Sequence, residues 1–384
     1  MKTSPIIISI LCLSALARAQ SVQDVKFPVY QTKYYEIHTD LTGDALREAE
    51  LRMTKMAEEY RARTRMFFGA ADQRLPFYLF RKAKDYYATG VPEDSSGVFT
   101  GTALLALAGE KTDLQTWHVI QHEGFHQYVN SVIGPNLPIW LNEGMAEYFG
   151  EALFTGDSFV SGLIPPWRLT RVQESLKNNE FVPLKDMLGL PVEQWNAKLS
   201  VNNYDQAWSM VQFLAHADNG RYEHLFVSFI SAVGRGKQWQ TAWRESFGPI
   251  EPFEARWKSY WANLPPDPTG PLYGQVAMRI LTSFLARSYT QDQHFNTYSD
   301  FATALNSNKV QIPPDDWLPP SLATDALGLA KTLGDWTLNN DKGALPHLTL
   351  ILKDNTQISG YFTLRRDGRI QSISAPIEGK RLRR

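Results

Sequence analysis

Two histidines one helical turn apart are the residues of this sequence best suited to chemistry. His122 and His126 stand at positions i and i+4 in the segment H-E-G-F-H. In a helix both imidazoles lie on one face, where each can bind a divalent ion such as zinc. Glu123 lies at the edge of that face, and its carboxylate could take a proton from a water that the ion has acidified. His118 lies a further turn back, which is too far round the helix for the same ion, and we expect it in the core or a pocket wall.

A second acidic segment could complete such a site. Catalytic zinc generally takes three protein ligands and keeps one position open, so a carboxylate should join the two histidines. Residues 140–149, W-L-N-E-G-M-A-E-Y-F, supply Glu143 and Glu147, again at i and i+4. A turn at residues 134–138 separates this segment from the histidines. One glutamate can bind the ion while the other holds a ligand histidine in place, and the spacing leaves the choice open.

Together the two segments resemble the gluzincin metallopeptidases of the MA clan, which include thermolysin-like and aminopeptidase N-like enzymes. The resemblance is closest to secreted bacterial members of that clan. It implies that His122, His126 and Glu143 bind zinc and that Glu123 is the general base, with Glu147 as a supporting residue or rival ligand. Sixteen residues separate His126 from Glu143, a shorter spacing than in the best-known members.

The same resemblance implies a donor for the oxyanion that forms during amide hydrolysis. In the aminopeptidase-like enzymes this donor is a tyrosine that opens a later helix. Tyr204 lies 61 residues beyond Glu143 and begins a comparable Y-x-x-A pattern. A donor there would stabilise the developing negative charge. His216 and His224 are the alternative donors.

The expected fold class is α+β. The resemblance covers residues 25–264 and implies a zincin-like core, with a small mixed sheet and a helical part that carries H-E-x-x-H. Alternating apolar residues predict strands at 33–39 and 75–80, and a helical pattern covers 44–68. Residues 97–108 read as a further strand or hairpin, and by the resemblance they form the edge that pairs with an extended peptide substrate, the alternative being an ordinary edge strand. They lack the G-x-M-x-N motif of aminopeptidases, which favours endopeptidase action.

We expect four successive parts along the chain. Residues 1–19 read as a signal peptide, residues 20–264 as the catalytic domain and residues 265–271 as a proline-rich linker. Residues 272–384 then form a smaller accessory module of helices followed by a β-meander. One of its helices is expected at residues 322–338.

The expected signal peptide bears on location and stability. It has a basic start, an apolar run of about a dozen residues that is too short to span a membrane, and an A-R-A cleavage site. The protein is therefore expected to be secreted or periplasmic. The only cysteine, Cys12, lies inside this segment, so the mature chain would have no disulfide.

The charge balance argues against two classes of partner. The chain has 39 Lys and Arg against 40 Asp and Glu. There is no basic excess to indicate binding to nucleic acid or to a membrane surface. The expected partner is a peptide or protein substrate.

The sequence therefore predicts a secreted zinc peptidase of the gluzincin type, most simply an endopeptidase. The alternative is a binding or cell-envelope scaffold protein that keeps a peptidase fold without turnover. Glu123 argues against the scaffold, because a purely structural zinc site needs no base. Metal-dependent hydrolysis of a non-peptide amide is the third possibility.

Overall fold

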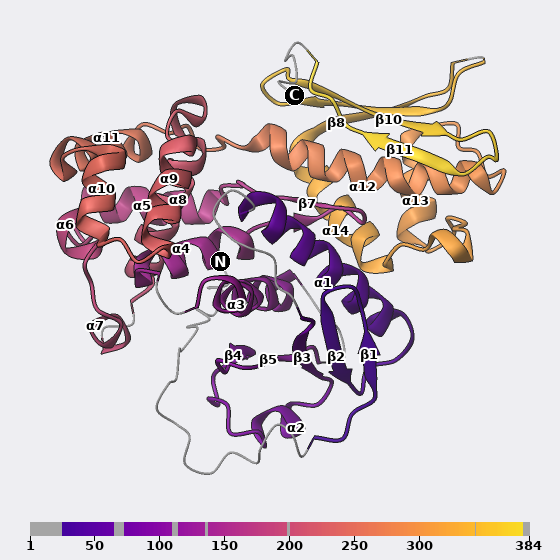
Figure 1. The fold of residues 1–384 in the computed structure, drawn as a ribbon. Coiled ribbons are helices and arrows are strands. Elements are labelled where there is room, and N and C mark those ends of the chain that lie inside the picture. Colours follow the sequence, from indigo (N-terminus) through magenta and orange to yellow (C-terminus); the bar gives the residue numbers. More distant parts are fainter. Residues whose placement is uncertain are drawn as a thin grey trace. The chain divides into compact units, whose positions relative to one another are not determined.

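The described residues form two compact units of mixed α and β structure. The computed structural model describes residues 25–64, 73–109, 114–134, 137–197, 200–341 and 343–378. The first unit runs to Ala152 and resumes at Ile164–Asp267, and the second contains Leu153–Leu163 and the chain from Pro268 (Figure 1). The expectation of an α+β class is confirmed at this level. The expected signal peptide lies outside the described residues.

A five-stranded mixed sheet forms the N-terminal part of the first unit. The strand order is β1-β2-β3-β5-β4, so β4 is an edge strand. The inner pairs β2/β3 and β3/β5 are parallel, and the outer pairs β1/β2 and β4/β5 are antiparallel. The bounds are β1 Val29–Gln31, β2 Tyr35–Thr39, β3 Leu75–Phe80, β4 Gly97–Phe99 and β5 Leu104–Leu107.

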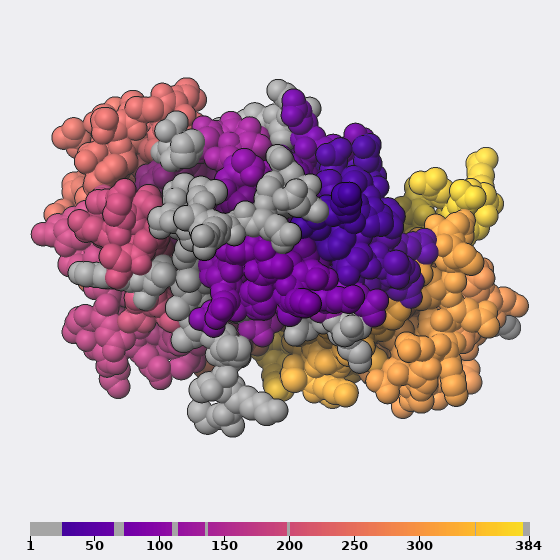
Figure 2. Space-filling view, turned by 90° about the horizontal axis from the view of Figure 1, so that it is seen from below, coloured from indigo at the N-terminus to yellow at the C-terminus, as the bar shows by residue number. Residues whose placement is uncertain are grey.

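Helices cover both faces of this sheet. Helices α1 (Gly43–Thr64) and α3 (Leu114–Val132) bury one face in a core that includes Ile37, Phe77 and Leu104. Alternate strand residues face the other side, where the short helix α2 (Ala83–Tyr87) packs on them. Figure 2 shows the segment that contains α2 as the surface of the unit on that side.

The rest of the first unit is helical. Four of its tryptophans are only 0–1 % exposed, so aromatic side chains form the core between these helices; they are Trp208, Trp243, Trp257 and Trp261. The bounds are α4 Ile139–Gly150, α5 Pro166–Lys177, α6 Leu184–Met187, α7 Val192–Ala197, α8 Val201–Gly220, α9 Glu223–Gly234, α10 Trp239–Phe247 and α11 Ile250–Ala262.

Two close contacts fix α4 between α3 and α8. The side-chain amide of Gln121 on α3 lies 3.0 Å from the carbonyl oxygens of Phe149, Gly150 and Ala152. These carbonyls lie at and just beyond the end of α4, where the i to i+4 hydrogen bonds of the helix stop. On the other side, a Cβ at Gly144 would lie 2.5 Å from the carbonyl oxygen of Ala207 on α8, so only glycine allows this approach.

The second unit packs α12 against a four-stranded antiparallel meander of order β11-β10-β9-β8. It also contains the hairpin of β6 and β7, whereas the expected catalytic domain, residues 20–264, was continuous. This hairpin lies against Leu318 and Leu322, beside Gly156. The bounds are β6 Leu153–Phe154, β7 Phe159–Val160, α12 Gly270–Thr290, α13 Tyr298–Asn306, a 3-10 turn Pro314–Asp316, α14 Pro320–Leu333, β8 Gly334–Asn339, β9 His347–Leu352, β10 Gln357–Leu364 and β11 Ile370–Ser374.

Of the helices in the described residues, none combines the length and the apolar character needed to cross a membrane.

Candidate metal centre

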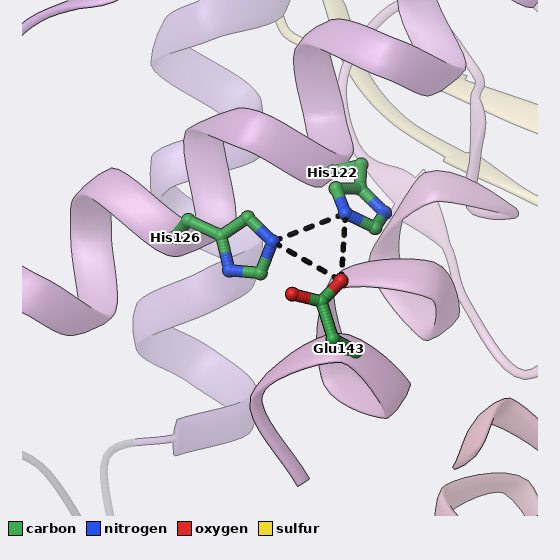
Figure 3. Close-up of side chains that lie close together, drawn as sticks. All are labelled: His122, His126 and Glu143. Carbon is green, nitrogen blue, oxygen red and sulfur yellow. Dashed lines mark hydrogen bonds and ion pairs between the residues drawn. The ribbon is translucent and has the colours of Figure 1, made fainter. Parts of the chain in front are cut away.

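Three side chains from two helices meet at one buried point. His122 and His126 project from α3 and Glu143 from α4, and all three are at most 3 % exposed (Figure 3). The Nε2 atoms of the two histidines lie 3.0 Å apart. Glu143 Oε2 lies 3.4 Å from Nε2 of His122 and 3.5 Å from Nε2 of His126. The two histidines and one of the two candidate glutamates therefore lie together.

This triangle has the size that a tetrahedral zinc ion requires. Donor atoms at about 2.0–2.1 Å from such an ion lie about 3.3–3.4 Å from one another. The three observed separations, 3.0, 3.4 and 3.5 Å, bracket that value. Glu143 Oε2 is also buried without a hydrogen-bond partner of good geometry, an arrangement that is costly for a polar atom. Two imidazoles and a carboxylate suit zinc, so the residues fit this ion.

Both imidazole rings are held from behind by α4. Nδ1 of His122 lies 3.1 Å from Glu147 Oε1, and Nδ1 of His126 lies 3.2 Å from Asn142 Oδ1. If each Nδ1 carries the proton and donates it to these oxygens, each Nε2 presents its lone pair to the centre of the triangle. Glu147 thus lies behind a ligand histidine, and Glu143 lies among the three converging atoms.

Electrostatics in the chain alone favour a proton on His122 and a negative charge on Glu143. Burial opposes this, but the carboxylates of Glu143 and Glu147, in contact with its two ring nitrogens, raise the pKa of His122 to about 10. Burial likewise opposes ionisation of Glu143, but the charge of His126 and the close ring nitrogens of both histidines lower its pKa to about 2. A divalent ion has to displace the extra proton on His122 in order to bind, which couples metal binding to proton release.

A second group of possible metal ligands lies next to the first, but an arginine side chain already pairs with its carboxylates. His118, Glu147 and Glu151 are close enough to share an ion. However, Nη1 of Arg168 lies 2.6 Å from Glu147 Oε2 and 2.8 Å from Glu151 Oε1. Burial opposes the charge on Glu147, but Arg168 holds its pKa well below the usual range. The guanidinium thus neutralises this group, and His118, which we expected in the core or a pocket wall, packs on Gly150 beside it.

Glu123 lies between the histidines and the edge strand. Its side chain is 4 % exposed, and its Oε2 accepts a hydrogen bond of 2.8 Å from the backbone N–H of Phe99 on β4. A Cβ at Gly97 would lie 2.5 Å from Val119 and 3.7 Å from Glu123, so the absence of a side chain there brings β4 close to α3. The edge strand and the expected base are therefore in direct contact.

Tyr204 lies near the start of α8, the helix that packs closely on α4 at Gly144. Burial raises the pKa of its hydroxyl far above the usual range, and the charge of Glu143 raises it further. The ring of Trp195 on α7 packs edge-on against it, with centroids 5.2 Å apart. The two alternative donors have other surroundings, because His224 is exposed and Nε2 of His216 lies 2.9 Å from the hydroxyl of Tyr148.

His216 should make the stability of the chain sensitive to mild acid. Burial first, and the charge of Arg63 second, lower the pKa of His216 from 6.5 to about 4. Between these values the unfolded chain binds a proton that the folded chain does not, so the free energy of unfolding falls as the pH falls. Urea unfolding at pH 6.5 and pH 5 should show a smaller decrease for His216→Gln than for the wild type. The exposed His224→Gln serves as the control, and an equal decrease in all three proteins would contradict this assignment.

Comparisons with known proteins identify no family. No protein-family model matches this chain, and a comparison with curated proteins finds no match. The function is therefore inferred from the geometry of the site. Two residues of this site were missed at the sequence level: Asn142, although it directly precedes Glu143, and Arg168, for which the local sequence carries no signal.

Proposed function

We propose that this protein is a zinc-dependent peptidase of the gluzincin type, with a zincin-like core. One observation carries the proposal: the convergence of His122 Nε2, His126 Nε2 and Glu143 Oε2 at separations of 3.0–3.5 Å in a buried site. A zinc ion bound there would polarise a carbonyl oxygen and lower the pKa of a water molecule to about 7. The neighbouring acid Glu123 favours an enzyme, because a purely structural zinc site would not need a base.

Glu123 would move the protons of the reaction. Its carboxylate takes a proton from the water that attacks the scissile carbonyl, and then returns it to the leaving amine nitrogen. The hydrogen bond from Phe99 N–H to Oε2 holds the carboxylate in one orientation. Tyr204 would donate its hydroxyl hydrogen to the carbonyl oxygen as negative charge develops there.

The edge strand β4 supports a peptide as substrate. β4 pairs with β5 on one side and ends the sheet on the other. An extended peptide could pair its backbone along this edge, next to Glu123, which already accepts the hydrogen bond of the Phe99 N–H. Endopeptidase action remains the preferred form, because residues 97–110 lack the aminopeptidase motif. With the expected signal peptide, such an enzyme would act outside the cytoplasm.

A peptide-library digest tests the proposal against the alternative scaffold. We expect the mature protein to cleave library peptides, a chelator to abolish cleavage and added zinc to restore it. Binding of peptides without any turnover would favour the scaffold. Turnover of non-peptide amides alone would retain the metal centre but reject the peptide substrate.

The Tyr204→Phe variant should lose turnover and keep substrate binding. Removal of one oxyanion donor typically lowers kcat by about 10²–10³-fold. KM and zinc content should stay near the wild-type values, because the ring still packs on Trp195. Steady-state kinetics on a library-derived peptide measure this, with Tyr260→Phe on α11 as the control. An unchanged kcat for Tyr204→Phe would remove this residue from the mechanism.

A further inference from the structure

We propose that Arg168 is the positioning residue of the metal centre: it fixes the carboxylate that orients His122 and ties the ligand helix α4 to the helix that carries Tyr204. This inference rests on the proposed zinc site and extends it to a residue that binds neither the ion nor a substrate.

Arg168 is buried in a ring of carboxylates. It projects from α5, and its side chain is 2 % exposed. Its Nη1 contacts Glu147 Oε2 at 2.6 Å and Glu151 Oε1 at 2.8 Å, and its Nε contacts Asp205 Oδ1 at 2.9 Å. The guanidinium plane also lies over the ring of Trp208, 4.5 Å from its centroid. A planar fork of this kind can hold several oxygens at fixed angles, which a lysine cannot do.

The two oxygens of Glu147 connect Arg168 to the metal centre. Oε2 is held by Arg168, and Oε1 lies 3.1 Å from Nδ1 of His122. A carboxylate fixed on one side in this way presents its second oxygen in one direction only. His122 is then oriented with its Nε2 toward Glu143, 3.4 Å away. Partners of this kind behind a ligand histidine set its orientation and its basicity.

The other side of the guanidinium connects the ligands to the proposed oxyanion donor. Asp205 follows Tyr204 directly near the start of α8, and Nη2 of Arg168 also lies 3.5 Å from the carbonyl oxygen of Tyr204. Arg168 thus bonds to α4 through Glu147 and to α8 through Asp205. Together with the close approach of Gly144 on α4 to Ala207 on α8, this side chain therefore helps to set the position of Glu143 relative to Tyr204.

A purely structural role for Arg168 would lead to a different experimental result. If Arg168 only neutralises buried acids, its loss lowers the stability of the fold and leaves the zinc affinity of the folded protein unchanged. If it positions Glu147, its loss weakens zinc binding even where the protein is folded. Changes to residues that hold a ligand histidine typically cost about 10–100-fold in metal affinity.

The test measures the zinc affinity of each folded variant by competition with a chelating dye. Circular dichroism in the absence of zinc shows whether each variant is folded. Arg168→Met should weaken zinc binding about 10–100-fold, and Arg168→Lys, which keeps a charge near Glu147, should weaken it less. The matched control is Arg171→Met on the same helix. Arg171 also binds Asp205, at 2.6 Å, but has no contact with Glu147 in the structure, so its variant should stay within about twofold of the wild type. Cobalt-substituted Arg168→Lys should show an altered visible spectrum.

A double-variant cycle then separates positioning from general damage. Arg168→Lys weakens zinc binding through Glu147, so it should add little to the loss already caused by Glu147→Gln. Because Arg168→Lys keeps the buried charge, the cycle stays informative if Arg168→Met fails to fold. The inference would be overturned if folded Arg168→Met or Arg168→Lys bound zinc with wild-type affinity, or if the losses in the cycle were fully additive. Either result would leave the proposed function as a zinc peptidase unaffected. A wild-type protein that binds no zinc would reject the proposed function itself.

Discussion

The Glu123→Gln variant is expected to lose peptide hydrolysis by about 10²–10⁴-fold while it keeps its zinc. The substitution is nearly isosteric, and the amide oxygen of glutamine can still accept the hydrogen bond from Phe99 N–H. What disappears is the ability to accept a proton from the attacking water. The metal ligands are not changed, so the loss belongs to the proton transfer.

The measurement is kcat/KM on a library-derived peptide together with zinc content per chain. Glu174→Gln, an exposed glutamate on α5, is the control and should match the wild type in both. Full activity of Glu123→Gln at full zinc occupancy would show that Glu123 is not the base. Loss of zinc in this variant would instead assign Glu123 to the metal site.

The second large effect is expected at the two glutamates of α4, which should behave differently. Glu143→Gln removes one of three protein ligands, and we expect a loss of about 10²–10⁴-fold in zinc affinity if the ligands share the binding free energy evenly. Glu147→Gln removes only the acceptor behind His122 and should cost about 10–100-fold. Both substitutions preserve side-chain shape, so the comparison reports on the oxygens themselves.

Zinc affinities of the two variants, measured by dye competition, decide which glutamate binds the ion. The structure places Glu143 Oε2 at 3.4 and 3.5 Å from the histidine nitrogens and pairs Glu147 with Arg168. If Glu147→Gln lost far more affinity than Glu143→Gln, the two roles would have to be exchanged.

The parts of this structure that depend on local spacing were accessible from the sequence. The strand expected at residues 75–80 is β3, and the i, i+4 histidines lie on one face of α3, because helical and strand periods fix which side chains share a face. The meander in the second unit was likewise expected from alternating residues.

The helix expected at residues 322–338 is wrong at its end. α14 stops at Leu333, and Gly334–Asn339 form β8 instead. The helical spacing of apolar residues continues past Leu333, which concealed the change. Gly334 allows it, because a Cβ there would lie 2.1 Å from the carbonyl oxygen of Ile351 on the neighbouring strand β9. Pairing with β9 therefore decides the conformation of this segment against its local pattern.

The parts of the site that join distant segments could not be read from the sequence. Arg168 and Asp205 lie 37 residues apart, and their contact depends on how α5 packs on α8. The hydrogen bond from Phe99 to Glu123 depends in the same way on the close approach of β4 and α3. Local patterns indicate which side chains share a face, whereas tertiary packing decides what that face meets.

The most direct test of the central claim is the number of zinc ions bound per chain. The mature protein is equilibrated with excess zinc, freed of unbound metal and analysed for zinc and protein content, beside the His122→Ala/His126→Ala double variant. The account predicts close to one zinc per wild-type chain and almost none in the double variant. Equal zinc content in the two proteins, whether near zero or near one, would contradict a metal centre built from His122, His126 and Glu143.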